Sequence, residues 1–557
     1  MNLNINPNLF RPNAVRFWLT VLMITCALLG CSEQNMEGGS HPKQNLANGT
    51  SLPKVSYYAA ARFLEQASWG PTPESIAEVQ RLGFSAWIDK QIAMRPFQIN
   101  APDFLYNFSD NDINAVNLAF KWLGRYREEM PLIAQDQLRV RVAWALFNFI
   151  PVGGGFQAYG YSTYQNLLLA HALGNYGQLL IGVTRNTVMA EFLDNKNNRY
   201  GSPNENYARE LMQLFSLGLI RLNIDGSSQR DSRGQSLETY SQKEVVSLTA
   251  ALSGWCHANL NNNLTRFGLP MRACNNGPRG HDDRAKELFG QKIPAGLDSV
   301  QELEIVASIL MGHPNIAPFV SRRLIQSLTT SQPSPAYIKR IAEQFVSSKG
   351  DLSVVVKSIL LDPEARAGDD PSSPPLPQFG RIKEPNLHHR NVLRGLGCKT
   401  LPRIKLTPSS TVAGKTDFFE GPQFMFNAPN VFGYVSPDHR APQSQINAPE
   451  QALLTSKELQ RRFWNPIDEY KLTVSSEPVM YQDAGCEIDL FVNAAKRSDA
   501  ALLNLASERF FRGAMPQSLR YQALKMLGSD LASVEPSRKF IQIMTFLWSS
   551  PAFGVVK

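Results

Sequence analysis

The sequence predicts a mainly α-helical globular protein, in which two helical subdomains are combined with long irregular loops. Apolar residues recur at helical spacing along most of the chain, and no alternating series of strands indicates a sheet of any size. The 557 residues include 43% hydrophobic and 10% aromatic residues, as in ordinary globular proteins. A chain of this length can bury two or more cores.

The N-terminal residues 1–30 are typical of an export signal. Arg11 and Arg16 are the only charged residues there, and they precede a mostly apolar run at 17–30 that is short for a membrane span. The run ends in Leu-Leu-Gly before Cys31, which resembles the cleavage site of a lipoprotein signal peptide, so acyl chains such as palmitate on Cys31 would anchor the protein in the lipid bilayer. Ser32 is not the Asp that retains lipoproteins in the inner membrane, which predicts an outer-membrane lipoprotein facing the periplasm or the surface. An ordinary secretory signal and an uncleaved anchor are the alternatives.

Composition divides the chain into five segments. The residues after the signal are rich in Ser, Asn, Gly and Gln and lack apolar periodicity, as in a flexible tether. Residues 368–377 consist mostly of Gly, Asp, Ser and Pro, which excludes a helix and indicates a linker. The predicted segments are a signal peptide at 1–30, a tether at 31–53, an N-terminal helical subdomain at 54–367, a linker at 368–380 and a C-terminal helical subdomain at 381–557.

Helices are predicted wherever the period of 3.6 residues is clear. Arg322 and Arg323 are expected to point outward from one of them, because apolar residues occupy the other face. The polar stretch 225–237 is expected to be an exposed hairpin or loop, and 403–445 is expected to wrap the surface or line a site. The predicted helices cover 56–66, 73–93, 131–149, 161–183, 185–193, 202–218, 241–254, 300–311, 314–330, two within 335–361, 384–396, 448–463, 488–512, 516–528 and 536–549.

Residues 202–218 are the most informative segment of the chain. Ser202 is a suitable N-cap, Pro203 suits the first helical position, and Glu205 completes a capping box. Gly218 supplies the helix stop. The expected apolar face consists of Ala208, Leu211, Met212 and Phe215.

The polar face of this helix has no Lys, unlike an ordinary solvated face. It carries Glu205, Asn206, Arg209, Glu210 and Gln213, and Glu205 and Arg209 have the i,i+4 spacing of an ion pair. Two interpretations follow: a well-capped surface helix, or a face that is buried against a polar site.

Several polar residues near this helix, dispersed along the sequence, are of types that bind metal ions or act in catalysis. Asp194 ends the preceding helix, and His281 and Asp282 lie in a turn flanked by glycines. Together with Glu205 and Glu210 they are ligand types for Zn²⁺, Mn²⁺ or Fe, while the carboxylates alone would suit Mg²⁺ or Ca²⁺, so their convergence would hold one divalent metal ion. Helix caps and ion pairs within the fold, or a partner-binding surface, are the alternatives. The catalytic candidates are Glu205, Arg209, Glu210, His281 and Asp282.

Four blocks of sequence follow one another in a specific order. They are 60–64 with 67–72, 192–195 with 203–211, 252–255 with His281, Asp282, Lys286 and Gly290, and 426–434. They resemble the opening, signature, middle and closing motifs of a large bacterial family catalogued as domain of unknown function 1800, although Tyr434 stands where a Trp is expected. The resemblance covers roughly residues 55 to 550 and implies a fold family without a defined reaction. Members often lie beside genes for a sulfatase-like exported protein, which implies a paired role by analogy.

Four cysteines remain beyond Cys26 in the signal and the lipid-bearing Cys31. An even number in an oxidising compartment permits two disulfides. Cys256 and Cys274 flank an Asn-rich loop and are the first expected pair. The second expected pair is Cys398 with Cys486, with free buried thiols as the alternative.

These observations favour a binding or assembly module for an envelope polymer or an exported partner, anchored at the outer membrane. The alternative is a metal-assisted hydrolase or transferase of the cell envelope, which requires the polar constellation to converge. The net charge of +8 is mild for this length and forms no basic run, which argues against nucleic acid as a partner. If the constellation does not converge, the aromatic loop at 417–440 is the next candidate for a binding surface.

Overall fold

The computed structural model describes residues 54–100, 123–124, 126–154, 158–258, 267–399, 423–460, 462 and 486–557. The chain from Pro53 to Lys557 is one compact unit. The expected export signal, the tether and Cys31 lie outside the described residues.

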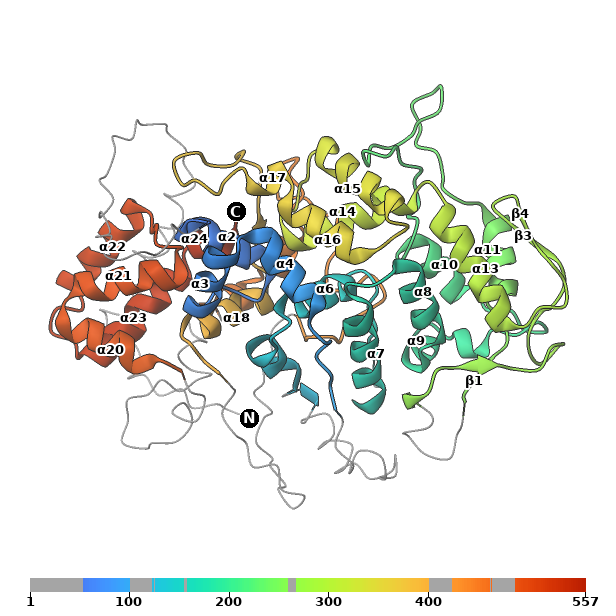
Figure 1. The fold of residues 1–557 in the computed structure, drawn as a ribbon, viewed down its shortest axis with the longest axis horizontal. Helices are drawn as coiled ribbons and strands as arrows, with labels where there is room; N and C mark the ends of the chain where they lie inside the picture. The colour runs from blue at the N-terminus through green and yellow to red at the C-terminus, as the bar shows by residue number, and fades with distance from the viewer. Residues whose placement is uncertain are drawn as a thin grey trace, which may run out of the picture. The chain divides into compact units, whose positions relative to one another are not determined.

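The mainly α-helical class is confirmed (Figure 1). Three short antiparallel sheets accompany the helices in the described part, pairing β1 (Trp255–Cys256) with β2 (Arg272–Ala273), β3 (Lys286–Leu288) with β4 (Gln291–Ile293) and β5 (Arg381–Ile382) with β6 (Val555–Val556). The helices are α2 (Tyr57–Ala67), α3 (Pro73–Leu82), α4 (Phe84–Ala93), α6 (Gln137–Phe147), α7 (Ala158–His171), α8 (Tyr176–Arg185), α9 (Thr187–Phe192), α10 (Asn206–Gln213), α11 (Gln242–Ala251), α13 (Ser299–Gly312), α14 (Ile316–Leu328), α15 (Pro335–Ser347), α16 (Leu352–Leu361), α17 (Pro363–Arg366), α18 (Pro385–Gly395), α20 (Ile488–Arg497), α21 (Asp499–Phe510), α22 (Gln517–Gly528), α23 (Pro536–Trp548) and α24 (Pro551–Gly554), with 3₁₀ turns η3 (Asn195–Asn197) and η4 (Pro449–Leu453).

Three predicted long helices are each broken into two. The prediction at 73–93 is interrupted by Gly83, whose φ of 82° ends α3 and starts α4. The prediction at 161–183 is interrupted before Asn175, whose side chain caps α8. The prediction at 488–512 is interrupted by Ser498, which is extended and caps α21. In each case a residue with capping geometry starts the second helix, although the apolar period continues through it.

The buried apolar residues form two clusters. The larger one extends from α2 to α16 and also includes Leu387, Phe426 and Val556 from the C-terminal part. The smaller one consists mainly of residues from Val392 onward, in α18 and α20 to α24. No helix forms within 368–377, as predicted, while the assignment of two subdomains on either side stays a prediction.

The C-terminal end of the chain returns to the N-terminal helices. In β5–β6, Arg381 pairs with Val556 and Ile382 with Val555, and Figure 1 shows α24 next to the blue α2. This return places β5 and the start of α18 in the middle of the fold, where a cavity opens.

Within the described residues, no single helix has both the length and the apolar character needed to cross a membrane. The pair α13 and α14 passes that test only when taken together, and it is bent by 79°.

Candidate functional site

The signature helix begins later than the sequence predicts. Helix α10 starts at Asn206, and its N-cap Glu205 makes no side-chain cap. Ser202 instead forms an antiparallel bridge with Arg199, and Asn204 Nδ2 donates to Asp194 Oδ2 at 2.8 Å. The predicted capping box at Ser202 is therefore wrong, because long-range partners hold residues 202–204 in a turn.

The C-terminal stop of this segment is confirmed in a modified form. The α-helix ends at Gln213, and the chain then turns until Gly218, whose amide donates to Met212 at 3.0 Å. Gly218 has a φ of 77°, and a Cβ atom there would lie 2.9 Å from the ring of Phe319. The glycine is needed both for its conformation and for the close approach to α14.

Most polar side chains on the polar face of α10 have hydrogen-bond or ion-pair partners within the protein. The predicted ion pair forms, with Arg209 Nη2 at 2.6 Å from Glu205 Oε2, and Gln242 Nε2 donates to Glu205 Oε1 at 2.9 Å. These hydrogen bonds from Arg209 and Gln242 lower the pKa of Glu205. The side chains of Arg209 and Glu205 are 43% and 35% exposed, so solvent screens the pair.

Glu210 differs from its neighbours on this face. It is half-buried, and burial raises the pKa of its carboxyl group although Arg209 opposes the shift. Its Oε2 atom is buried without a hydrogen-bond partner among the described residues. Of the carboxylates on this face, Glu210 is therefore the one whose burial and raised pKa are typical of a functional residue rather than of a surface ion pair.

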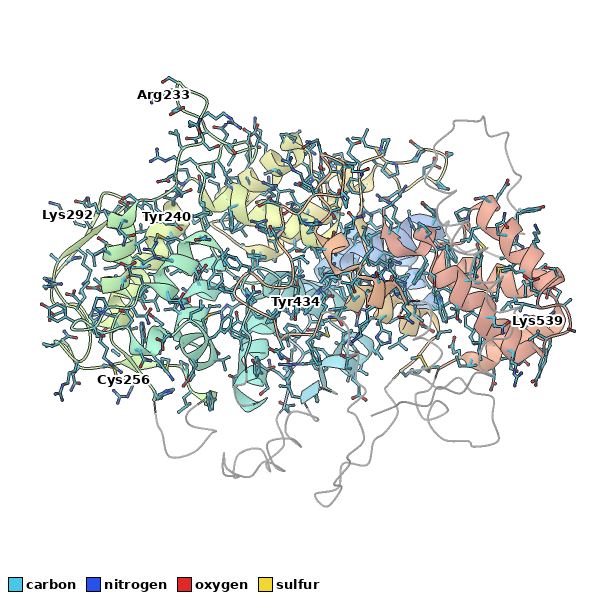
Figure 2. All side chains as sticks on the ribbon, turned by 180° about the vertical axis from the view of Figure 1, so that it is seen from behind. Arg233, Tyr240, Cys256, Lys292, Tyr434 and Lys539 are labelled. Carbon is cyan, nitrogen blue, oxygen red and sulfur yellow. A yellow bond between two sulfur atoms is a disulfide. The ribbon has the colours of Figure 1, made fainter. Side chains whose placement is uncertain are left out.

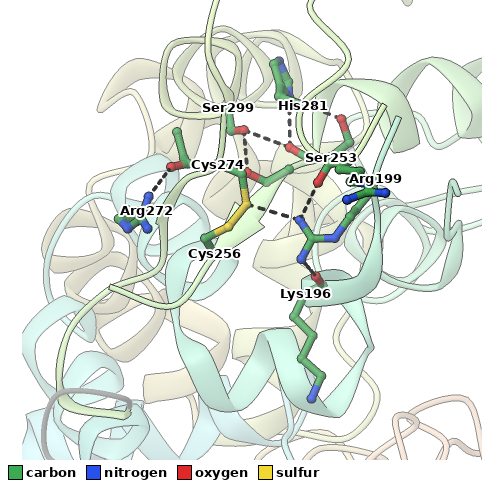
Figure 3. The surroundings of a disulfide bond; sticks show 11 residues. Lys196, Arg199, Ser253, Cys256, Arg272, Cys274, His281 and Ser299 are labelled. Carbon is green, nitrogen blue, oxygen red and sulfur yellow. Dashed lines mark hydrogen bonds between the residues drawn. A yellow bond between two sulfur atoms is a disulfide. The ribbon is translucent and has the colours of Figure 1, made fainter. Parts of the chain in front are cut away.

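His281 and Asp282 lie in a separate buried cluster around Ser253 (Figure 3). His281 Nδ1 is 2.9 Å from the Ser253 carbonyl oxygen, and its Nε2 is 3.5 Å from Glu302 Oε1. Lys286 Nζ donates to the same Glu302 oxygen at 2.6 Å. His281 and Glu302 have no exposed surface, so this cluster has the features of a buried hydrogen-bond network that stabilises the fold rather than of an open binding site.

Asp282 is held by its own turn. Arg284 donates to both carboxylate oxygens, at 2.9 and 2.7 Å, and Ser253 Oγ accepts from the Asp282 amide. Burial opposes ionisation, but the Arg284 hydrogen bonds hold the pKa of Asp282 below its ordinary value. Asp194 is likewise used locally, since Asn197 and Asn204 donate to its carboxylate.

The candidates thus do not share one hydrogen-bonded group. Glu205 pairs with Arg209, Asp194 bonds Asn197 and Asn204, and His281 and Asp282 lie in the Ser253 cluster. Helix α11 contacts α10, and it also contacts β3 and α13. No hydrogen bond or ion pair joins Glu205 or Glu210 to His281 or Asp282. Over the described ranges, no group of three or more His, Cys, Asp or Glu is placed to hold a metal ion. Convergence on one metal stays a prediction.

Both expected disulfides are present. Cys256 and Cys274 have Cα atoms 5.3 Å apart, and Cys398 is bonded to Cys486. Figure 3 shows the first disulfide beside the Ser253 cluster, where Arg199 Nη1 lies 3.3 Å from Cys274 Sγ.

A cavity of about 630 Å³ opens where three segments meet. One wall is the end of α10 and the turn that follows it, from Gln213 to Ile220, another is α14 from Phe319 to Ser327, and the third is the closing segment from Val431 to Asp438. This volume lies within the range of roughly 300–1,000 Å³ that is typical of ligand pockets. The cavity therefore brings together two segments, 213–220 and 431–438, that lie more than 200 residues apart in sequence.

The closing segment is fixed by contacts with the loop after α6. The Ala428 amide donates to the Val152 carbonyl at 3.0 Å. Gly433 has a φ of 77°, and a Cβ atom there would lie 2.9 Å from the Asn148 carbonyl oxygen. These backbone contacts place Phe432 and Tyr434 at the cavity wall.

An aromatic cluster supports this wall. Trp144 packs against Phe426, Tyr434 and Trp69, with ring centroids 5.3, 5.7 and 6.0 Å away. Figure 2 shows Tyr434 between the green helices of the N-terminal half and the red C-terminal helices. The opening block takes part through Trp69, whose carbonyl accepts from Asn391 Nδ2 in α18 at 2.8 Å. Tyr434 is thus partly buried next to Trp144, at the cavity wall.

Buried charges line the floor of the cavity. Arg381 Nε donates to Glu450 at 2.9 Å and its Nη2 lies 3.5 Å from Glu384. Glu384 also accepts from Trp144 Nε1 at 2.7 Å and from Gln423 Nε2 at 3.0 Å. Burial alone would raise the pKa of Glu384, but Arg381 and Arg141 lower it below its ordinary value.

Arg141 lies directly behind this floor and has no exposed surface. Its Nη2 donates to the Ser327 carbonyl at 2.5 Å, an oxygen that Arg381 also contacts at 2.6 Å. Burial, followed by the neighbouring Arg381, lowers the pKa of Arg141 to about 9. Arg381 therefore contacts both carboxylates, and Arg141 places a second buried positive charge near them in a region shielded from solvent.

The two arginines of α14 form the other end of the cavity. Arg322 Nη2 donates to Asp438 at 2.8 Å, and Arg323 Nη2 lies 3.8 Å from the second Asp438 oxygen. The Arg323 guanidinium lies over the Phe319 ring, 5.0 Å from its centroid. The expectation that both arginines point outward is wrong for Arg323, whose side chain is 16% exposed and lines the cavity.

The closing segment lies within 403–445, which was expected to wrap the surface or line a site. Sequence reasoning missed the arginines and glutamates of the cavity because their partners are distant in sequence. One signal was available in 384–396, where His, Arg and Asn occupy several sides of a predicted helix. The corresponding helix, α18, is buried along its whole length. A helix with polar residues all round that lies at the centre of a fold must satisfy them internally, which points to a polar network.

A family model described as a protein of unknown function, DUF1800, matches residues 62–555. The chain belongs to this family. Searches of curated proteins and of solved structures found no match. In this DUF1800 protein part of the closing block lines the cavity, and so does the segment that follows the signature block. The opening block supports the cavity wall through Trp69, and the middle block supplies most of the Ser253 cluster.

Proposed function

We propose that the protein is an exported lipoprotein, anchored at the outer membrane through Cys31, and that its cavity binds an envelope polymer. The anchor rests on the apolar run at 17–30 followed by Leu-Leu-Gly before Cys31. The two disulfides are compatible with an oxidising compartment.

The cavity carries the binding part of this proposal. Its rim presents Phe432 and Leu219, which are 58% and 54% exposed, and the amides of Asn148 and Gln213 also line the cavity. Exposed apolar groups beside convergent polar groups are typical of ligand sites. A repeating polar chain with apolar ring faces, such as a polysaccharide, fits this mixture.

The anchor is tested by replacing the acylated residue. Cys31→Ala is expected to lose acyl labelling and to move from the membrane to the soluble fraction. Unchanged labelling and fractionation of this variant would refute lipidation at Cys31.

The cavity is tested by cosedimentation with polysaccharide isolated from the envelope of the producing cells. Phe432→Ala should weaken binding about tenfold, as expected for an aromatic anchor at a binding site. Tyr521→Ala is the matched control, because Tyr521 is 65% exposed on α22 and does not line the cavity.

Equal loss in both variants, or no binding by the wild type, would overturn polymer binding. Capture of an exported sulfatase-like protein that depends on Phe432 would replace the polymer by the exported partner that the family resemblance implies.

A second candidate function, a hydrolase of the envelope, is favoured by Glu210 alone. Its raised pKa and unpartnered Oε2 suit a general acid, and Gln213, one turn later, lines the cavity. Loss of turnover of a bound polymer in Glu210→Gln, with binding retained, would establish this function.

A further inference from the structure

Positive charge is in excess along the cavity. Its charged lining residues are Arg322, Arg323, Arg381 and Arg440 against Glu384, Asp438 and Glu450. Glu384 and Glu450 are both used by Arg381. Asp438 is therefore left as the single carboxylate that faces the two arginines of α14.

The Asp438 carboxylate bridges these arginines from the solvent side. One oxygen lies 2.8 Å from Arg322 and the other 3.8 Å from Arg323. The Asp438 side chain is 57% exposed, on a segment without regular secondary structure. An exposed carboxylate in this position holds its partners weakly and can be exchanged for another anion.

Two polar atoms beside this bridge have no partner among the described residues. Arg323 Nη1 is a buried donor and Gln326 Oε1 is a buried acceptor. Gln326 is 4% exposed, and its Nε2 is already used by the Ser331 carbonyl at 3.1 Å. Buried polar atoms without partners are costly, so both are expected to meet a ligand or solvent.

The arginines are held ready for an anion. Arg323 is positioned by stacking on Phe319, which the close approach of Gly218 in turn fixes. Burial lowers the pKa of Arg323 to about 10, which leaves it cationic at neutral pH. Two guanidinium groups side by side match the oxygens of a carboxylate or a sulfate.

We propose that this end of the cavity is a subsite for an anionic group on the bound polymer, and that Asp438 occupies the subsite until that group displaces it. The group is a carboxylate or a sulfate carried by a sugar unit. Arg322 and Arg323 bind its oxygens, and Gln326 Oε1 accepts a hydrogen bond from a hydroxyl group of the same unit. The polymer as the source of the anion rests on the proposed function.

The subsite is tested on the full chain with two simple probes, inorganic sulfate and acetate, whose binding is measured by calorimetry. Asp438→Asn should bind the preferred probe about fivefold more tightly, the change expected for removing one exposed competing ion pair. Arg323→Gln should weaken binding at least about tenfold, since it removes a charge-assisted hydrogen bond.

Arg322→Gln is the second variant, since Arg322 is 28% exposed and its loss leaves the core intact. The matched control is Arg520→Gln, because Arg520 bonds Asn504 on the C-terminal helices and does not line the cavity. Preference for sulfate or for acetate identifies the anionic group. Binding of neither probe by Asp438→Asn, or binding that Arg322→Gln leaves unchanged, overturns the subsite.

The anion subsite and polymer binding can fail separately. If carboxyl-reduced and desulfated polymer binds as tightly as the native polymer, the anion subsite is wrong and polymer binding stands. If sulfate or acetate binds with the expected dependence on Asp438 while no polymer cosediments, the subsite stands and the polymer is wrong.

Discussion

The polar face of α10 and the floor of the cavity contain the same kinds of residue, yet their charges are satisfied differently. Arg209 and Glu205 are 43% and 35% exposed. Arg381 and Glu384 are 2% and 4% exposed and depend on protein partners alone. Ion pairs in water contribute little, whereas breaking a buried pair leaves an uncompensated charge. The more conspicuous sequence motif is therefore energetically the weaker of the two regions.

The largest effect is expected from Glu384→Gln. The substitution keeps the shape of the side chain but leaves Arg381 and Arg141 with Glu450 as their nearby carboxylate. The free energy of unfolding should fall by about 3 kcal/mol or more, measured by urea denaturation at pH 7. A loss below about 1 kcal/mol would show that solvent screens the cavity floor as well as it screens α10.

Acid should expose the same difference without a mutation. The pKa of Glu384 is lowered in the folded protein, so its stabilising effect is fully present above its unfolded pKa of about 4.3 and is lost as the pH falls through the folded value. The urea midpoint of the wild type should drop more steeply between pH 5 and pH 3 than that of Glu384→Gln. Parallel curves for the two proteins would contradict the assigned role of Glu384.

Local signals predicted the α10 region better than the cavity. The Glu205–Arg209 pair and the apolar face of α10 were predictable because both depend on residues three or four positions apart. The start of α10 was not, since Asp194 and Arg199 hold the residues before it. Only the whole fold brings such distant partners together.

The cavity depends almost wholly on such long-range contacts. Arg381 meets Glu450, 69 positions away, and Arg141 meets Ser327, 186 positions away. Hydrophobic periodicity places a helix but does not reveal which polar side chain faces an internal neighbour. Arg323 shows this limit. Its position opposite an apolar stripe predicted a solvent-exposed side chain, but the side chain lines the cavity beside the closing segment.

Glu210→Gln should have a smaller effect, of opposite sign. The pKa of Glu210 is raised in the folded protein, so its contribution is most favourable below the unfolded pKa and is lost as the pH rises through the folded value. At pH 7 the variant should therefore be more stable than the wild type, by up to about 1 kcal/mol because the site is partly solvated. The gain should disappear near pH 4.

The same variant distinguishes a functional group from a tolerated one. Increased stability together with lost turnover of polymer is the pattern of a strained catalytic group. Increased stability with unchanged binding and no turnover in either protein would assign Glu210 to the surface of α10. Decreased stability of Glu210→Gln at pH 7 would mean that another group stabilises the ionised Glu210 carboxylate of the wild type.

The smallest effect on stability is expected from Glu205→Gln, which tests the exposed ion pair of α10 against the buried charges of the cavity floor. Solvent-exposed pairs at i,i+4 contribute about 0.3–0.5 kcal/mol, and the amide introduced by the substitution could still bond Gln242. Glu343→Gln is the control, because Glu343 and Lys339 form an exposed i,i+4 pair at 3.9 Å on α15, away from the signature helix. Urea denaturation at low and high salt should give small losses for both variants that shrink as salt screens the charges. A loss from Glu205→Gln that approaches the one from Glu384→Gln and resists salt would mean that the α10 face is covered in the working protein, and the signature helix would then become the contact surface for a partner.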